Sequence, residues 1–451
     1  MRIKLGIPAT CLILFLLSQL LFLINIQFPR TPNFDEFHYI PSAKQFLALT
    51  ENQNYEHPPL GKELIAISIA IGGDRPIGWR LMSTFFGALT LVGMYLWGLA
   101  VFRDRKAALF TAILTLFNQL LYVQARIGML DTFMFAFMVY ALAAFCSVWT
   151  LEIDAKTARK RLLFTGAMFG FSMACKWFAV LPLAVAVGMI GLVRVLQSWR
   201  TVFLENPKLA GNRNSTDTVP DFFDDWYHPD LLKDLRLRDL ALAFIAMPLF
   251  CYYLTFIPFF FIHGQNHNLY EILFTMQYKM WDGQMRVVSP HPYTSTWTEW
   301  PLMLRPIWYA FDKEGSFGEW VRGVILLGNP LIMWGGLIAL AICVADWIQN
   351  KSREAFLIVA IYAGLYLSWA VIPRKISFYY YYYPAGMTLS LAIAYVFSRW
   401  AGHVDESRLA WARGLFLAAA ISMFIYFFPI LAALKIHGDQ FRQWMWLTRW
   451  I

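Results

Sequence analysis

The sequence predicts an all-α, polytopic membrane protein, and three observations carry this prediction. The 451 residues are 59% hydrophobic and only 15% charged, whereas soluble domains carry about 25% charged residues. The mean hydropathy is +0.49. The apolar residues also come in blocks long enough to cross a hydrocarbon layer of roughly 30 Å. This composition excludes a secreted disulfide scaffold, a disordered chain and a cytosolic enzyme.

Eleven apolar blocks are expected to form membrane-spanning helices. The first, about residues 5–28, follows Arg2 and Lys4, but it is too long for a signal peptide and lacks a small-residue cleavage site. The stretch 162–196 would be about 52 Å long as one helix, so we divide it after Trp177. The other blocks are about 79–101, 107–123, 132–150, 239–262, 321–347, 355–372, 378–398 and 411–434.

The basic residues predict the orientation of the chain in the membrane. The net charge is +9, but the basic residues form no stripe of the kind that binds nucleic acid. With a cytoplasmic N-terminus, the basic loops at 102–106 and 151–161 fall on the inner side, as the positive-inside rule requires. We therefore expect a single membrane domain over 1–451, with long outer segments at about 29–78 and 263–320. The polar inner loop 197–238 is predicted to be flexible.

The first outer segment contains an acidic pair and a proline turn. Asp35 and Glu36 follow the first span directly. Acids in this position often stabilise a helix N-terminus through its dipole, and the alternative is a catalytic carboxylate near the membrane surface. Adjacent helical residues do not share a face, so the two acids would have different roles. The turn that follows would hold His57 and Lys62 beside the acids.

Three other features fall on the same outer face. Arg126 and Asp131 lie at the outer ends of two consecutive spans, where charged side chains often extend to the interface. Lys176 interrupts a continuous apolar stretch, and an ammonium at that depth needs a partner or an aqueous cavity. The segment 289–309 fits either an amphipathic interfacial helix or an aromatic platform for sugar rings or lipid.

A cluster of cations precedes a run of aromatic residues near the C-terminal spans. Arg374 and Lys375 stand just before five consecutive tyrosines at 379–383. Such tyrosines are common in the interfacial belt of membrane proteins. Two cations beside them can also bind a phosphate headgroup. Acids, cations and aromatics on one face suggest an enzyme that acts on an anionic, lipid-linked substrate and a polar acceptor.

In their order along the chain, the motifs resemble those of the protein O-mannosyltransferases. They are FDEFHY, HPPLGK, GWR, ARIGMLD, CKW, HPYTSTWTEWPLMLRPIWY, GNP and PRKISFYYYYYP, between about residues 33 and 385. The resemblance implies the GT-C glycosyltransferase fold, with about eleven transmembrane helices and an outer-face active site. It also implies inverting transfer of mannose from a polyprenyl- or dolichyl-phosphate carrier to Ser or Thr hydroxyls of exported proteins.

The same resemblance assigns roles to individual residues. Asp35 is the expected general base, and Glu36 would shape the acceptor site or pair with Arg126. The cations expected to bind the donor phosphate are Arg126, Lys176, Arg374 and Lys375. The residues expected around the sugar and acceptor are His57, Lys62, Arg80, Asp131, His291, Tyr293, Trp297 and Arg305.

The resemblance also bears on cofactors, partners and location. The leaving group carries a single phosphate, so no metal is required, and no metal-ligand spacing occurs, although the wider GT-C class includes metal users. Eukaryotic members carry a lumenal β-trefoil (MIR) insertion, for which 263–320 is too short. We therefore expect a bacterial-type enzyme of the cytoplasmic membrane that uses a polyprenyl carrier. Its expected partners are this lipid donor, an exported Ser/Thr protein and membrane lipids, with the export machinery as a further candidate.

Three other functions can be compared with these features of the sequence. A GT-C transferase that moves a lipid-phosphate-linked sugar to a lipid or glycan, as aminoarabinose transferases do, shares the acidic pair and the donor. A flippase for the lipid-linked sugar would show inverted repeats, and the sequence has no symmetry between its halves. A structural membrane subunit would leave the acidic pair and Lys176 without a role.

Overall fold

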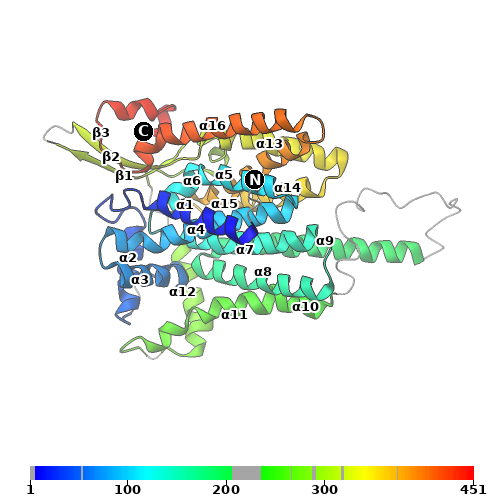
Figure 1. Cartoon of the computed structure of the whole chain (residues 1–451). Coiled ribbons are helices and arrows are strands. Elements are labelled where there is room, and N and C mark those ends of the chain that lie inside the picture. Colours follow the sequence, from blue (N-terminus) through cyan, green and yellow to red (C-terminus); the bar gives the residue numbers. More distant parts are fainter. Residues whose placement is uncertain are drawn as a thin grey trace.

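The computed structural model describes residues 6–51, 54–205, 235–265, 267–286, 291–315, 319–372 and 374–451. It is a bundle of long helices that run in roughly the same direction across Figure 1. Seven helices in the described part of the chain are long and apolar enough to cross a membrane. The mainly helical, polytopic membrane fold is thus confirmed, while the count of eleven spans stays a prediction.

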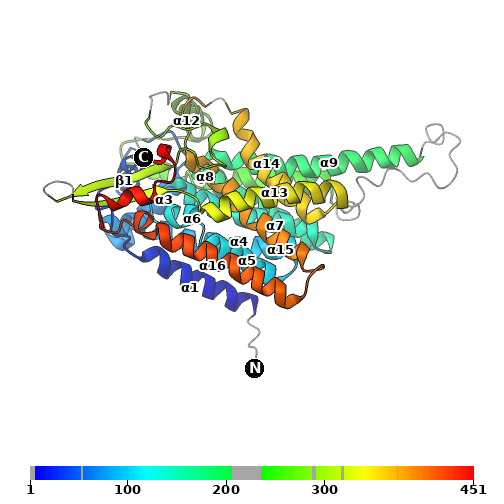
Figure 2. The same cartoon turned by 90° about the horizontal axis from the view of Figure 1, so that it is seen from above.

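Each of the eleven predicted spans contains at least one helical segment, but some helices begin or end at other residues than predicted. The helices of the bundle are α1 (Ile7–Leu23), α4 (Pro76–Phe102), α5 (Arg105–Leu116), α6 (Gln119–Gln124), α7 (Leu130–Thr150), α8 (Ala155–Cys175), α9 (Val180–Glu205), α10 (Leu237–Ala241), α11 (Met247–Leu254), α13 (Pro330–Asn350), α14 (Arg353–Leu367), α15 (Tyr383–Trp400) and α16 (Glu406–Leu431). Figure 2 shows α9 extending beyond the bundle. Residues 206–234 of the predicted flexible loop lie outside the described residues.

Two predicted spans need correction and one division is confirmed. The block 107–123 breaks at Asn118, whose side chain accepts a hydrogen bond from the backbone of Leu120 and so begins a new helix, α6. The block 321–347 starts too early, because its first residues form a strand and the helix begins at Pro330. The stretch 162–196 does divide, since α8 ends at Cys175 and α9 begins at Val180.

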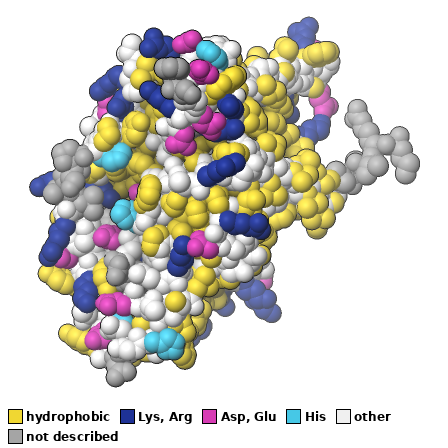
Figure 3. Space-filling model, turned by 90° about the vertical axis from the view of Figure 1, so that its left-hand side faces the viewer, with side chains coloured by type: hydrophobic (Ala, Val, Ile, Leu, Met, Phe, Trp, Pro, Cys, Tyr) yellow, Lys and Arg dark blue, Asp and Glu magenta, His cyan; other side chains and the backbone are white. Residues whose placement is uncertain are grey.

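The connecting segments gather at one end of the bundle, which we call the loop end. It holds α2 (Glu36–Leu47), α3 (Leu60–Gly72), α12 (Met276–Met285) and the strands β1 (Ile307–Glu314), β2 (Trp320–Leu326) and β3 (Ile436–His437). Figure 3 looks at this end and shows charged and histidine side chains spread over it. Charged and histidine side chains are thus available at the loop end for a functional site.

The strands form a small antiparallel sheet in the order β1-β2-β3. The register pairs Ile307 with Leu326 and Glu314 with Trp320. This small sheet is an addition to the mainly helical fold that the sequence predicts. The alternative of an amphipathic helix over 289–309 is wrong, because the described part of this segment forms turns and the start of β1. Prolines interrupt that segment, and its end is rich in aromatic and β-branched residues that favour strands.

Helix α8 approaches the segment 242–254 at backbone contact. Gly166 and Gly170 lie one turn apart on α8. A Cβ atom on Gly166 would lie 1.8 Å from the carbonyl oxygen of Ala243, and one on Gly170 would lie 2.5 Å from that of Pro248. Small residues at this spacing allow close helix packing in membranes. The two glycines therefore set the position of α8, which ends at the functional site described below.

We predict that Gly166→Ala and Gly170→Ala each lower the thermal unfolding midpoint of the purified protein in detergent. The added methyl group meets backbone atoms that cannot rotate away, and such overpacking costs about 1–3 kcal/mol. Gly188→Ala on α9 is the matched control, because nothing lies within 4 Å of its new Cβ. An unchanged midpoint in both α8 variants would show that these helices are not packed at backbone distance.

Candidate active site

Asp35 stands at the start of α2, at the loop end. Its carboxylate is partly exposed, and its Oδ2 accepts a hydrogen bond from the hydroxyl of Tyr39 at 3.2 Å. Burial raises the pKa of Asp35, Asp131 raises it further, and Lys176 opposes both effects. A carboxylate with a raised pKa is a better proton acceptor than an ordinary aspartate. Asp35 thus has the position and the environment expected of a general base.

Glu36 is fully buried and fully paired. Its two oxygens accept from Nε and Nη2 of Arg80, both at 2.8 Å. They also accept from the backbone N–H groups of Asn33 at 3.0 Å and Gly128 at 2.8 Å. Bidentate charge-assisted bonds of this kind are among the strongest in proteins. Glu36 therefore holds the first loop in place and presents no free oxygen to a substrate.

Arg80 completes this network from α4. Its Nη1 donates to the carbonyl oxygens of Ile26 at 3.1 Å and Pro29 at 2.8 Å. The side chain is 1% exposed. These contacts show that Arg80 holds the first loop against α4. Its predicted contact with sugar or acceptor stays a prediction.

Arg126 does not pair with Glu36, which corrects the expectation from the sequence. It donates to the carbonyl oxygens of Phe22 and Leu431, both at 3.1 Å, and its guanidinium lies 4.7 Å from the ring centre of Tyr122. The first and last helices of the bundle are thereby joined. Arg80 takes the acid instead because it lies across from Glu36 on α4, a contact that spacing along the chain does not reveal.

Lys176 has the partner that its depth in the apolar stretch required. Its Nζ lies 3.0 and 2.8 Å from the two oxygens of Asp131, and both side chains are buried. The ammonium also lies 4.7 and 5.1 Å from the ring centres of Tyr380 and Tyr381. The pair joins the start of α7 to the end of α8 beside Asp35.

A cavity of about 270 Å³ lies next to this pair. Its lining combines polar and apolar side chains. The polar part of the lining is formed by Glu56, His57, Lys176, Gln284, Arg374 and Tyr381. The apolar part is formed by Trp177, Phe178, Val180, Leu181, Trp281, Met285, Trp369 and Ile372. A site that offers both cations and apolar side chains suits an anion attached to a hydrocarbon chain.

The charge of the polar part of the cavity lining depends on Arg374 and His57, next to Lys176. The guanidinium of Arg374 lies 4.9 Å from the ring centre of Tyr381 and donates through Nε to the carbonyl of Ile376. His57 faces the amide of Gln284 at 3.3 Å. Burial lowers the pKa of His57 well below its usual range, and the nearby charges of Lys176, Lys62 and Arg374 lower it further. His57 is therefore neutral, and the positive charge belongs to Arg374 and Lys176.

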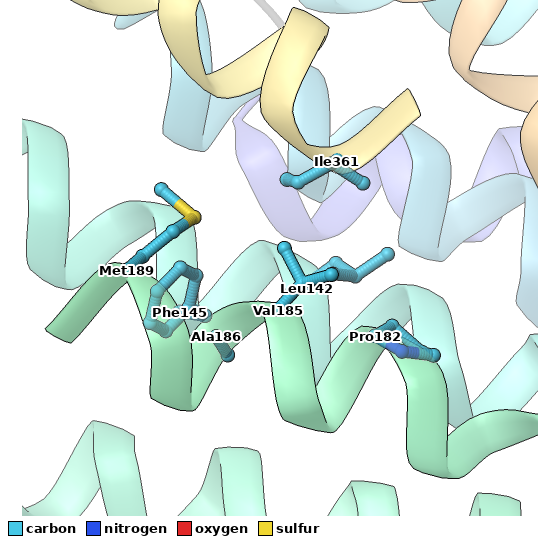
Figure 4. Close-up of a pocket in the computed structure, with 7 residues that line it drawn as sticks. All are labelled: Leu142, Phe145, Pro182, Val185, Ala186, Met189 and Ile361. Carbon is cyan, nitrogen blue, oxygen red and sulfur yellow. The ribbon is translucent and has the colours of Figure 1, made fainter. Parts of the chain in front are cut away.

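Helix α9 also lines a second, narrower pocket, which lies further along the helix from the loop end. It lies between α7, α9 and α14 and is lined only by apolar side chains, as Figure 4 shows. The lining residues are Leu142, Phe145, Pro182, Val185, Ala186, Met189 and Ile361. It offers no hydrogen bond and no charge, so it carries no chemistry of its own.

Two of the predicted site residues, Lys62 and Arg305, support the loops without lining the cavity. Lys62 is buried, and its Nζ donates to the carbonyl oxygens of Asn54 at 2.7 Å and His57 at 2.8 Å. Burial lowers the pKa of Lys62 to about 7. Arg305 donates to the carbonyl oxygens of Arg449 and Pro292, both at 2.8 Å.

Four more predicted residues lie around the site at different distances from its chemistry. The His291 ring packs against Phe34, beside Asp35, at 5.4 Å between ring centres, and burial lowers its pKa. Tyr293 lies under the guanidinium of Arg305, and Trp297 packs against Tyr366. Lys375 is exposed and does not line the cavity. The roles of these residues stay predictions.

Three aromatic residues at the centre of the site were not assigned from the sequence. Tyr39 binds Asp35, as described above, and its position four residues later on α2 is a signal that helical spacing could have given. Phe34 contacts the ring of Tyr309 at 5.2 Å between ring centres. The Tyr309 hydroxyl is buried beside the side-chain amide of Gln124. Burial, Asp131 and Asp35 raise the pKa of Tyr309, and its contact with Gln124 opposes them.

The described residues contain no group of three or more His, Cys, Asp or Glu side chains placed to hold a metal ion. The groups around Asp35 are one paired acid, two cations, a neutral histidine and tyrosines. This set can accept a proton, stabilise a phosphate and stack against a sugar ring.

Two family profiles match the chain. One, described as the C-terminal four TMM region of protein-O-mannosyltransferase, matches residues 269–450. The other, described as dolichyl-phosphate-mannose-protein mannosyltransferase, matches residues 56–208. Among known proteins, the chain is 25% identical to a polyprenol-phosphate-mannose–protein mannosyltransferase of Mycobacterium tuberculosis. That alignment covers 93% of this chain and 87% of the relative.

Solved structures show the same fold. The Saccharomyces cerevisiae protein O-mannosyltransferase Pmt1-Pmt2 complex bound to the sugar donor matches with a TM-score of 0.78 at 14% identity, over 100% of this chain and 93% of that chain. ArnT from Cupriavidus metallidurans bound to undecaprenyl phosphate matches with a TM-score of 0.59 at 15% identity, over 95% and 76%. The predicted GT-C architecture is confirmed by these likenesses.

We predict that Glu36→Ala destabilises the protein far more than loss of an exposed ion pair. The substitution leaves the Arg80 guanidinium buried without its carboxylate, and removing one partner of a buried pair costs about 3–5 kcal/mol. The control is Asp405→Ala, which removes an exposed pair with Arg408 and should cost at most about 1 kcal/mol. Thermal unfolding in detergent measures both. Equal shifts for the two variants would refute the anchoring role of Glu36.

Proposed function

The chain belongs to the protein O-mannosyltransferase family, and from this premise we propose that it transfers mannose from a polyprenyl-phosphate donor to Ser or Thr hydroxyls of exported proteins. The observation that supports this most strongly is the cavity lined by Lys176, Arg374 and apolar side chains. A polyprenyl phosphate has the same combination of charge and hydrocarbon. Tyr39 connects the cavity to Asp35, because Tyr39 bonds to Asp35 and packs against His57 of the cavity lining. The lower likeness to ArnT makes a lipid acceptor the less favoured alternative.

The proposed reaction is a single displacement at the anomeric carbon. The acceptor hydroxyl oxygen attacks C1 of mannose as the bond from C1 to the phosphate oxygen breaks, which inverts the configuration. The hydroxyl proton passes to the carboxylate of Asp35, and general-base catalysis of this kind contributes typically 10²- to 10⁴-fold. The polyprenyl phosphate leaves with one more negative charge than it had as the donor.

Cations beside the leaving phosphate stabilise this additional charge. Lys176 is already paired with Asp131. No described residue accepts a hydrogen bond from the two terminal nitrogens of Arg374, so Arg374 is the cation with the most capacity for a phosphate. Since two side chains supply this charge, we propose that the reaction needs no metal ion.

The orientation in the membrane is part of the proposal. The basic segments 102–106 and 151–161 connect α4 to α5 and α7 to α8, and we assign both to the cytoplasmic side. The N-terminus is then cytoplasmic, and the loop end faces the outside of a bacterial cytoplasmic membrane. Exported proteins reach this face as they leave the export machinery.

We predict that Asp35→Asn abolishes mannose transfer while leaving donor binding within about threefold. The amide has nearly the same shape as the carboxylate, but it cannot accept the proton, so the loss should reach about 10²-fold or more. Transfer from labelled polyprenyl-phosphate-mannose to a Ser/Thr-rich peptide measures the first quantity, and equilibrium binding of the donor measures the second. Turnover close to that of the wild type would exclude Asp35 as the base.

We predict that Arg374→Ala weakens donor binding and slows transfer by about tenfold or more, whereas Lys375→Ala changes neither by more than about twofold. The first residue lines the cavity and the second is exposed beside it, and loss of a charge-assisted bond typically costs 1.5–3 kcal/mol. The neighbouring lysine is thus a control for general charge effects. Equal effects of the two substitutions would place the donor phosphate elsewhere.

A further inference from the structure

The strand β1 has one edge that no other described strand covers. In the sheet order β1-β2-β3, β1 pairs only with β2. No described residue outside the sheet forms a backbone–backbone hydrogen bond with Ile307–Glu314. Figure 1 shows β1 on the side of the sheet that faces the first outer loop, where Asp35 lies. An open strand edge offers a row of N–H and C=O groups to another extended chain.

The two halves of β1 differ in their exposure to solvent. Its first four residues are buried, and the next three, Phe311, Asp312 and Lys313, are exposed. Tyr309 belongs to the buried half, and its ring contacts Phe34, the residue before Asp35. The strand therefore leads from the surface of the loop end directly to the proposed base.

We propose that the acceptor polypeptide binds in extended conformation along the exposed half of the β1 edge, Phe311–Lys313, and thereby brings its Ser or Thr hydroxyl to Asp35. This inference rests on the proposed function. Addition of a strand to a sheet edge supplies main-chain hydrogen bonds and needs no particular sequence. It accounts for an enzyme that acts on side-chain hydroxyls in many different chains, because the hydrogen bonds come from the backbone.

The direction of the strand specifies which flank of the acceptor makes the contact. Because β1 runs outward from Tyr309, an antiparallel chain runs inward, and antiparallel pairing is the more stable arrangement. The residues on the N-terminal side of the target hydroxyl then lie along Phe311–Lys313. Lys313 is four residues from Tyr309, which corresponds to roughly 14 Å of extended chain.

The first test is a scan of the acceptor peptide with single backbone N-methyl groups. Each group removes one N–H and blocks one edge contact. Alternate N–H groups of a paired strand point toward its partner, so we expect KM to rise about tenfold or more at every second position on the N-terminal side. The positions between them should change less than about twofold, and kcat should stay the same. A scan without this alternation would overturn the inference.

The second test uses the two edges of the same sheet. Asp312→Cys places a thiol on β1, and His437→Cys places one on β3 at the opposite edge. Both are made with Cys11→Ser, which removes the one native cysteine that is not buried. A peptide with cysteine three or four residues before its threonine should form a disulfide with the β1 variant at least tenfold faster. Equal rates at both edges would exclude β1 as the docking edge.

The two tests also separate this inference from the proposed function. If the unmodified peptide receives mannose but the scan and the disulfide rates show no preference, β1 docking is wrong and the activity stands. If the enzyme transfers mannose to a lipid or glycan and never to a peptide, the proposed function is wrong, and the docking inference is overturned with it.

Discussion

The buried ion pair of Glu36 with Arg80 is the constraint on which the geometry of the site depends. It ties the start of α2 to α4, and its hydrogen bonds reach the loop before α2 and the turn before α7. Asp35 immediately precedes Glu36, and adjacent residues at a helix start point in different directions. Anchoring one acid in the interior therefore presents the other to the site. Glu36 thus has a structural task, and Asp35 is left for the chemical role proposed above.

The balance of charge at the loop end follows from this arrangement. Glu36 is satisfied by Arg80, and Asp131 is satisfied by Lys176. Among the described residues, Asp35 and Arg374 have no oppositely charged partner within salt-bridge distance. Charges without a partner in a partly enclosed site are those that a substrate can complete. The proton of an acceptor hydroxyl and the phosphate of a lipid donor would complete them.

Much of the fold could be predicted from the sequence, because blocks of apolar residues report directly on the membrane. The division of α8 from α9 followed from the length limit on a single crossing. The strand β2 was missed because WVRGVIL is a short apolar run, and periodicity does not distinguish a buried strand from the start of a helix. Nothing in the hydropathy of residues 320–326 indicated that they pair with β1.

The site was predictable in its residue types and less so in its pairings. That Lys176 needed a partner followed from its depth, but its identity did not, because Asp131 lies 45 residues earlier in the chain. Arg126 and Arg80 are both arginines near the outer ends of spans, and only the packing of α4 against the first loop decides that Arg80 takes Glu36. Long-range contacts between helices determine such choices, and spacing along one chain does not contain them.

The surroundings of Asp35 explain how two chemically different substrates can reach one carboxylate. Toward the cavity, Tyr39 donates a hydrogen bond to Asp35 and packs its ring against His57, which lines the cavity. On the other side, Phe34 packs against Tyr309 of β1. The rings beside Asp35 thus connect it both to the cavity proposed for the lipid donor and to the strand proposed for the acceptor. In the proposed reaction these separate approaches would keep the hydrocarbon of the donor away from the polar acceptor, and the two would meet at the carboxylate that is proposed to take the proton.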